Sequence, residues 1–147
     1  MDLLEEIKRE IEKGKDIEEI LKKFSWKSFE QIVEAIFQIH GFKTKRNFRF
    51  KTKRRFEIDV LAYKNNYGFC VECKKWNLNW NRKSKIKEAC LKNEEKCKEL
   101  RKIWNWKKFK LQSLVVTLWQ EDLKEFSKTK IVSIYKLNSF LLEEFLP

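Results

Sequence analysis

The chain has 147 residues, of which 42% are hydrophobic, a size and composition typical of one compact domain with a real core. One proline and three glycines give no sign of a flexible linker. No apolar run reaches the roughly 18 residues that a membrane span needs. The charged opening residues, MDLLEEIKREIEKG, lack the apolar core of a secretory signal. We therefore expect a cytoplasmic protein with no membrane partner.

The charge balance points to an anionic partner. The sequence has 34 Lys and Arg against 22 Asp and Glu, a formal net charge of +12. Nucleic acid is the first partner that such an excess suggests. A Lys- and Glu-rich surface of the thermophilic kind is the alternative, but that bias adds charges of both signs and explains a positive excess poorly.

The first third of the chain predicts helices. Residues 2–24 form two short predicted helices that break at Gly14. The segment SWKSFEQIVEAIFQIHG, residues 25–41, predicts a longer helix that ends at Gly41. Its apolar residues recur at the spacing of a core-facing stripe: Phe29, Ile32, Val33, Ile36 and Phe37.

The middle of the chain predicts a meander of three strands followed by a helix. The strands are expected at residues 42–50, 55–63 and 67–74, with a hairpin turn at Asn65-Asn66. A long helix is expected from Ser84 to Ile103.

The remainder predicts a buried strand at residues 113–119, a short helix at 121–126, a strand at 130–136 and a closing helix after Asn138. This order predicts an α/β fold with a central mixed sheet flanked by helices. We expect residues 1–24 to be an N-terminal helical extension and residues 25–147 to be the main domain.

The four cysteines have two interpretations. Cys70 and Cys73 form a C-x-x-C pair, but residues three apart in a strand face opposite ways. Cys90 and Cys97 lie seven apart on the predicted long helix. We interpret all four as buried core thiols. A zinc or iron–sulfur cluster is the alternative.

Two carboxylates interrupt the predicted buried strands. With Asn65 and Asn66 as the central turn residues, Asp59 falls directly opposite Glu72. Opposed carboxylates repel each other unless a proton or a cation holds them. A hard cation such as Mg²⁺ or Mn²⁺ prefers these oxygen ligands. A different turn, an exposed Asp59, or a simple ion pair between Lys74 and Glu57 would remove the need for a metal.

The helix before these strands offers a third carboxylate. Glu30 lies beside Phe37 at the edge of the apolar stripe, whereas Glu34 is predicted to point toward solvent. Glu30 can therefore be a third oxygen ligand or hold a metal-bound water. A peripheral, solvated glutamate is the alternative.

At these residues the sequence resembles a known group of enzymes. Asp59 followed by Glu72-Cys73-Lys74 fits the D…(D/E)-x-K pattern of the restriction-endonuclease-like, or PD-(D/E)xK, nucleases. The Asp-to-Glu spacing, the preceding helix with Glu30 and the GF pair at 41–42 resemble archaeal Holliday-junction resolvases. The tail LVVTLWQEDLKEFSKTKIVSIYKLNSFLLEEF is similar to the end of Mrr-type restriction endonucleases. Residue 58 is Ile rather than Pro, and the first 24 residues have no counterpart.

The resemblance implies a fold and an activity. The fold would be the restriction-endonuclease-like core. Asp59 and Glu72 would bind the metal, Glu30 would assist, and Lys74 would position the attacking water and stabilise charge on the phosphate. The protein would be a Mg²⁺- or Mn²⁺-dependent deoxyribonuclease, an endonuclease of restriction, repair or junction-resolving type that acts on duplex or branched DNA. The alternative is an inactive nucleic-acid-binding module of the same fold.

Two basic stretches flank the acidic residues. FKTKRNFRFKTKRRF has eight basic residues from Lys43 to Arg55, and strand alternation predicts that those at 43, 45, 49, 51 and 53 share one face. A second stretch follows Lys74. We expect the DNA-binding residues to be Lys43, Lys45, Arg46, Arg49, Lys51, Lys53, Arg54, Arg55, Lys75, Trp76, Trp80, Arg82 and Lys83.

Trp76 and Trp80 can stack on unpaired bases, or cover the core or a second copy in a homodimer. Solvated charge on an edge strand is the alternative for the basic run.

Overall fold

A computed structural model of the chain describes residues 2–75, 82–104 and 110–144. Its helices are α1 (Leu3–Glu12), α2 (Ile17–Phe24), α3 (Phe29–Ile39), α4 (Arg82–Ile103) and α5 (Leu137–Glu144), with 3-10 turns at Trp26–Ser28 and Ile134–Lys136. Its strands are β1 (Lys43–Lys51), β2 (Arg55–Lys64), β3 (Tyr67–Lys74), β4 (Lys110–Thr117), β5 (Glu125–Phe126) and β6 (Thr129–Ser133). Within these ranges, no helix is both long and apolar enough to cross a membrane.

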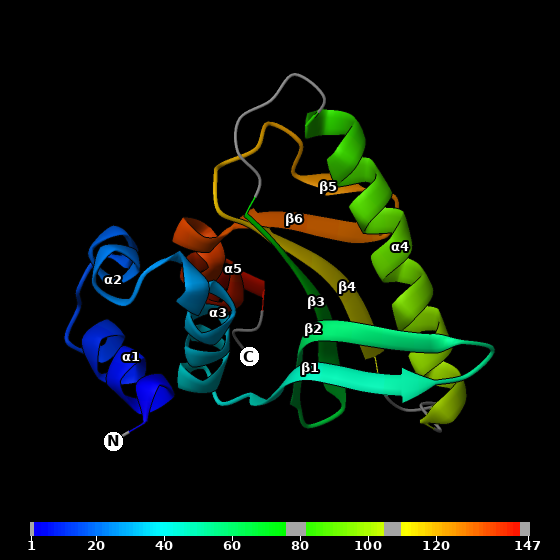
Figure 1. Cartoon of the computed structure of the whole chain (residues 1–147), viewed down its shortest axis with the longest axis horizontal. Helices are drawn as coiled ribbons and strands as arrows, with labels where there is room; N and C mark the ends of the chain where they lie inside the picture. The colour runs from blue at the N-terminus through cyan, green and yellow to red at the C-terminus, as the bar shows by residue number, and fades with distance from the viewer. Residues whose placement is uncertain (1, 76–81, 105–109, 145–147) are drawn as a thin grey trace.

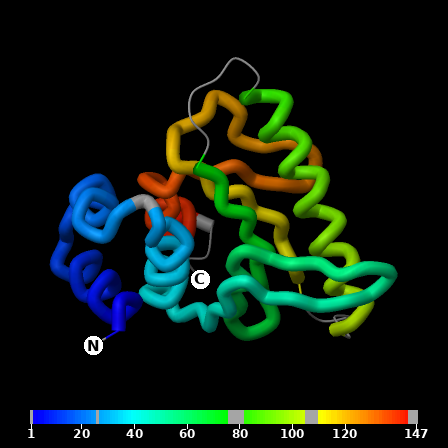
Figure 2. The backbone as a smooth tube through the Cα atoms, in the orientation of Figure 1, coloured from blue at the N-terminus to red at the C-terminus, as the bar shows by residue number. Residues whose placement is uncertain are grey.

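The six strands form one mixed sheet in the order β1-β2-β3-β4-β6-β5. β1, β2 and β3 are an antiparallel meander, whereas β3, β4 and β6 run parallel to one another. The short β5 pairs with β6 antiparallel at one edge. Figure 2 traces this path, with the chain crossing by way of α4 between β3 and β4. The predicted α/β fold with a mixed sheet is confirmed.

Helices cover both faces of the sheet (Figure 1). On one face, α1, α2, α3 and α5 enclose a cluster that includes Ile7, Phe37 and Phe69. On the other face, Leu100 of α4 packs against Leu61 of β2. Because Ile7 belongs to the first cluster, the two N-terminal helices share the core of α3.

The β2–β3 hairpin has the predicted turn. The ladder closes with the pair Lys64–Tyr67, which leaves Asn65 and Asn66 as the two turn residues. Asn65 has φ of 54°, a left-handed conformation that asparagine tolerates. The turn sets the register, in which Leu61 pairs with Cys70.

The short helix predicted at residues 121–126 is wrong. Glu125 and Phe126 instead form β5, which turns back on β6 through Ser127, whose φ is 55°. Phe126 packs against a cluster that contains Ile131 of β6. Burial of this ring by a hairpin outweighs the weak helical tendency of such a short segment.

The single basic face predicted for β1 is also wrong, because the strand changes sides at Asn47. Thr44 donates a hydrogen bond to Glu34 of α3, whereas Phe48 packs in the cluster of α4. These two residues would share a face in a regular strand. Asn47 has φ of 53°, and the ladder omits the pair of Asn47 with Asp59. Lys43 and Lys45 therefore do not share a face with Arg49 and Lys51.

The cysteines are core thiols rather than a cluster. Cys70 and Cys97 lie in the cluster under α4, Cys90 lies in a neighbouring cluster, and Cys73 packs on the α3 side of the sheet. All four are free. Among the described residues, no group of three or more His, Cys, Asp and Glu could hold a metal ion, so the four-cysteine alternative has no support.

The break at Asn47 leads to a prediction about stability. Replacing Asn47 with Val should lower the free energy of unfolding by about 1–2 kcal/mol, because a branched side chain is strained in the left-handed region. Asn47→Gly should be neutral or stabilising. Denaturant unfolding measures both, with Arg49→Val as the control at an exposed position of the same strand. Equal stability of Asn47→Val and wild type would contradict the left-handed conformation.

Candidate active site

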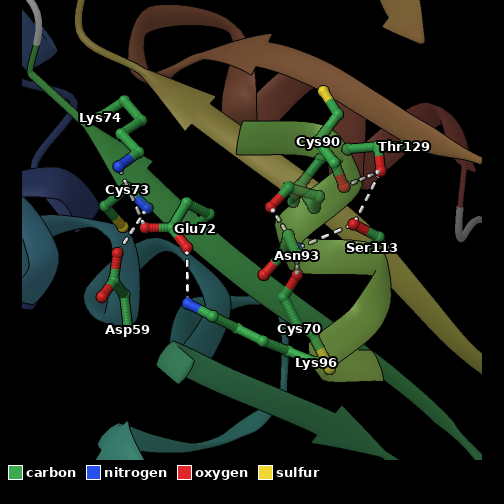
Figure 3. A network of polar contacts seen from close by, with 11 residues as sticks. Asp59, Cys70, Glu72, Cys73, Lys74, Cys90, Asn93, Lys96, Ser113 and Thr129 are labelled. Atoms are coloured by element: carbon green, nitrogen blue, oxygen red, sulfur yellow. Dashed lines mark hydrogen bonds and ion pairs between the residues drawn. The ribbon is translucent and has the colours of Figure 1, made fainter. Parts of the chain in front are cut away.

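The site lies where β2 and β3 separate. Their ladder ends at the pair Val60–Val71, one residue before Asp59 and Glu72 would meet. Beyond it, the backbone N–H of Cys73 donates a 2.9 Å hydrogen bond to Oδ2 of Asp59 (Figure 3). The Asp59 side chain thus takes the place of a strand-to-strand backbone contact, and both carboxylates are held at one point of the sheet.

Asp59 is an unusually weak acid. Burial, followed by repulsion from the Glu72 carboxylate, raises the pKa of Asp59 from 3.8 to about 7, although the Cys73 N–H opposes this. The carboxyl group of Asp59 therefore holds a proton in the range where most aspartates are ionised.

Glu72 is the opposite case. Burial alone would raise the pKa of Glu72, but Lys96, hydrogen bonding with Asp59 and the charge of Lys74 together lower it below its usual value. The strongest of these is Lys96 of α4, whose ammonium donates a 2.9 Å hydrogen bond to Oε2. The Lys74 ammonium lies 3.5 Å from Oε1. Glu72 is therefore the ionised partner of a pair whose other member resists ionisation.

Glu30 borders this pair from α3. Glu30 is half-buried, and burial raises its pKa. Its carboxylate repels those of Asp59 and Glu72, which also raises the pKa of Asp59. The structure does not gather Glu30, Asp59 and Glu72 into a group of three close enough to hold a metal, in the part of the chain that it describes. Glu30 therefore lies at the margin of the site.

The chemistry of the donor set fits Mg²⁺ or Mn²⁺. Mg²⁺ is usually held by one or two carboxylates, with waters and substrate phosphates completing its shell. Asp59 and Glu72 supply two carboxylates, and a dication would relieve the repulsion that raises the pKa of Asp59. The residues present would thus hold the cation with Asp59 and Glu72 as its protein ligands.

Comparisons with known proteins show the family of the chain. Residues 21–101, more than half of the chain, match the Mrr_cat family model, described as restriction endonuclease. The chain belongs to the Mrr_cat family. An uncharacterized protein of Archaeoglobus fulgidus is 30% identical to it over 117 residues, which cover 79% of this chain and 88% of that protein.

The fold of this Mrr_cat protein also has a solved counterpart. The crystal structure of the protein of unknown function AF1548 matches with a TM-score of 0.55 at 20% identity. The match covers 78% of this chain and 64% of the other, so the chain spans a little under two thirds of that structure's length. The restriction-endonuclease-like fold and the PD-(D/E)xK resemblance are confirmed.

One neighbour of the site differs from its prediction. Glu34 is buried rather than turned toward solvent, and it accepts a 2.7 Å hydrogen bond from Thr44 while Arg46 lies 3.7 Å away. β1 covers the side of α3 on which the helical spacing had predicted that Glu34 faces solvent. Periodicity within α3 could not reveal a strand that packs beside it.

The predicted DNA-binding residues separate into three groups. Most are exposed: Lys43, Lys45, Arg46, Arg49, Lys51, Lys53, Arg54, Arg55, Lys75 and Lys83. Arg82 is not, because its side chain is only 17% exposed and its guanidinium pairs with Glu121 at 2.8 Å, so we remove it from the DNA-binding surface. Trp76 and Trp80 lie outside the described residues.

Two of the exposed residues line a cavity that reaches Asp59. Arg54, just before β2, and Arg55, its first residue, line a cavity of about 350 Å³ that Asp59 and Lys96 also line. The cavity lies between β2 and α4, and the Arg54 guanidinium pairs with Glu95 at its rim. The two arginines and Asp59 therefore share one cavity, together with Lys92 and Lys96 and the acidic Glu57 and Glu95.

Sequence reasoning missed Lys96. It lies in a helix rich in lysine, and no motif distinguishes it from the others. The available signal was its place between Asn93 and Cys97, two residues of the buried stripe of α4. A lysine at the edge of a buried stripe can reach over the sheet that the helix covers.

The raised pKa of Asp59 predicts a dependence of stability on pH. A carboxyl group whose pKa is higher in the folded protein than in the unfolded chain favours folding while it is protonated. Its contribution is complete below about pH 4 and is lost as pH rises through about 7. In EDTA, wild type should therefore lose stability relative to Asp59→Asn across this range.

Denaturant unfolding at several pH values tests this. The control is Asp122→Asn, which removes an exposed carboxylate from the loop after β4 and should keep the wild-type pH dependence. Parallel pH profiles for wild type and Asp59→Asn would show that Asp59 ionises normally.

Proposed function

We propose that this Mrr_cat protein is an endonuclease that hydrolyses phosphodiester bonds in DNA, with Mg²⁺ or Mn²⁺ as its cofactor. The observation that carries the proposal is the pair Asp59 and Glu72, with Lys74, at the point where β2 and β3 separate. Membership of a restriction endonuclease family supports it. We further propose that residues 25–147 are the nuclease domain, with residues 1–24 as an extension, and that the protein acts in the cytoplasm.

Each residue has a proposed role in the hydrolysis. When bound, the divalent cation supplies Lewis-acid polarisation of a phosphoryl oxygen and acidifies a water molecule. Asp59 and Glu72 would be its ligands. Lys74, whose ammonium is 3.5 Å from Glu72, positions the attacking water and stabilises negative charge on the reacting phosphate. Glu30, at the margin, acts through ordered water.

The proposed substrate is DNA because positive charge surrounds this site. Arg54 and Arg55 line the cavity beside Asp59, and Lys75 follows the motif directly. The net charge of +12 favours a polyanion over a small neutral substrate. Contacts of this kind hold the phosphate backbone and carry no sequence information.

The cleavage test uses duplex, single-stranded and branched DNA with Mg²⁺, Mn²⁺ or EDTA. Wild type should cut with either metal and not in EDTA, and Asp59→Ala or Glu72→Ala should abolish cutting, because each removes a ligand. Lys74→Ala should slow cleavage by roughly 10²–10³-fold with little loss of binding.

Glu125→Ala is the control, since it removes an exposed carboxylate that pairs only with Lys130 among the described residues. Cleavage in EDTA, or wild-type rates in both ligand variants, would contradict the proposal. Tight DNA binding without cleavage of any substrate would favour an inactive binding module.

The binding test separates the DNA surface from the chemistry. Charge reversal of Arg54 and Arg55 to Glu should weaken binding to unrelated sequences equally, because phosphate contacts are lost. The slope of log K against log salt should fall by about 2, one unit for each contact.

The matched control reverses Lys13, just after α1, and Lys22 of α2, two exposed lysines. Both helices lie at the opposite end of the molecule from the β1–β2 hairpin (Figure 1). Both variants change the net charge equally. If both weaken binding to the same extent, net charge rather than a local surface governs the affinity.

A further inference from the structure

A second lysine, Lys96 of α4, forms a hydrogen bond with Glu72. Lys96, in the second half of α4, donates its 2.9 Å hydrogen bond to Oε2, while Lys74 lies near Oε1 (Figure 3). The two oxygens of one carboxylate thus face two ammonium groups that come from a helix and a strand.

This contact differs from the surface ion pairs of the same helix. The side chains of Lys96 and Glu72 are 21% and 11% exposed. Those of Lys92 and Glu88, one turn earlier, are 71% and 62% exposed and pair at i, i+4. Exposed pairs of that kind contribute little to stability. Lys96 instead loses water and side-chain freedom to reach across to β3, a cost that a solvated lysine avoids.

The position of α4 against the sheet is fixed just before Lys96. Asn93 is fully buried, and its amide donates 2.8 Å hydrogen bonds to the carbonyl of Cys70 and to Oγ of Ser113. Asn93 and Lys96 are three apart and therefore neighbours on the helix surface. The two bonds fix the position of α4 along β3 and β4, so that the Lys96 ammonium lies within hydrogen-bond distance of Glu72.

An oxygen that accepts this hydrogen bond is closed to a second cation. Two-metal phosphodiesterase sites place two cations about 3.5–4 Å apart with carboxylates between them. A dication on Oε2 would have to break this charge-assisted hydrogen bond, which is stronger than one between neutral groups. The 3.5 Å contact of Lys74 is longer than a good hydrogen bond and leaves Oε1 open to a cation.

We propose that Lys96 is a positioning residue: its hydrogen bond occupies Oε2 of Glu72, so that Asp59 and Glu72 bind a single divalent cation. The Lys96 ammonium supplies the positive charge that a second cation would bring. This inference rests on the proposed metal-dependent function, which assigns no number of cations and no role to Lys96.

The test counts Mn²⁺ ions bound to the protein without DNA, from the electron paramagnetic resonance signal of free Mn²⁺. Wild type should bind one Mn²⁺ per chain, and Lys96→Met should bind a second, because Oε2 is released. Lys96→Arg, which keeps a charged donor, should bind one. Two ions on wild type, or one on Lys96→Met, would overturn the proposal.

Two controls make the result specific. Lys98→Met makes the same charge change at an exposed position two residues further along α4, on another side of the helix, and should leave one ion bound. Circular dichroism checks that Lys96→Met is folded. If it is not, Lys96→Ala, which also removes the donor, replaces it with the same expectation.

Asp59→Asn separates this inference from the proposed function. If wild type binds no more Mn²⁺ than Asp59→Asn, both the metal-dependent function and the role of Lys96 fail. If wild type and Lys96→Met each bind one ion that Asp59→Asn loses, the function stands and only the role of Lys96 falls.

Discussion

The hydrogen bond from the Cys73 N–H to the Asp59 carboxylate is the contact on which the site depends. It forms where the β2–β3 ladder has ended, and it replaces a backbone bond by a side-chain bond. A buried backbone N–H needs a partner, and here the partner is an acidic side chain. Asp59 is thereby kept close to Glu72 even though the two carboxylates repel each other.

That repulsion is resolved unequally because the lysines lie on one side only. Lys96 and Lys74 both approach Glu72, whose pKa falls, whereas burial and the Glu72 charge raise the pKa of Asp59. One carboxylate is therefore ionised and the other holds its proton more tightly. A pair of titratable groups pushed apart in this way is typical of sites that do chemistry.

Helix α4 connects the core to the site. Its stripe from Ile86 to Leu100 packs on the sheet, and Asn93 within that stripe bonds to the backbone of β3. At its first residue, Arg82 pairs with Glu121 of the loop after β4, so the start of the helix is also fixed. The position of Lys96 is a consequence of this packing, because Lys96 lies next to Cys97 of that stripe.

The sequence by itself determined the order of the elements other than β5, the hairpin at Asn65 and the proximity of Asp59 to Glu72, since these follow from local periodicity and turn chemistry. It did not determine which side chains of β1 share a face, because a single left-handed residue at Asn47 interrupts the alternation. Nor could it place Glu34, Arg82 and Lys96, whose partners lie on elements distant in sequence. Local sequence patterns describe the spacing of residues within one helix or strand. Only the packing of elements decides which charged side chain meets which partner, because that depends on contacts between residues far apart in the chain.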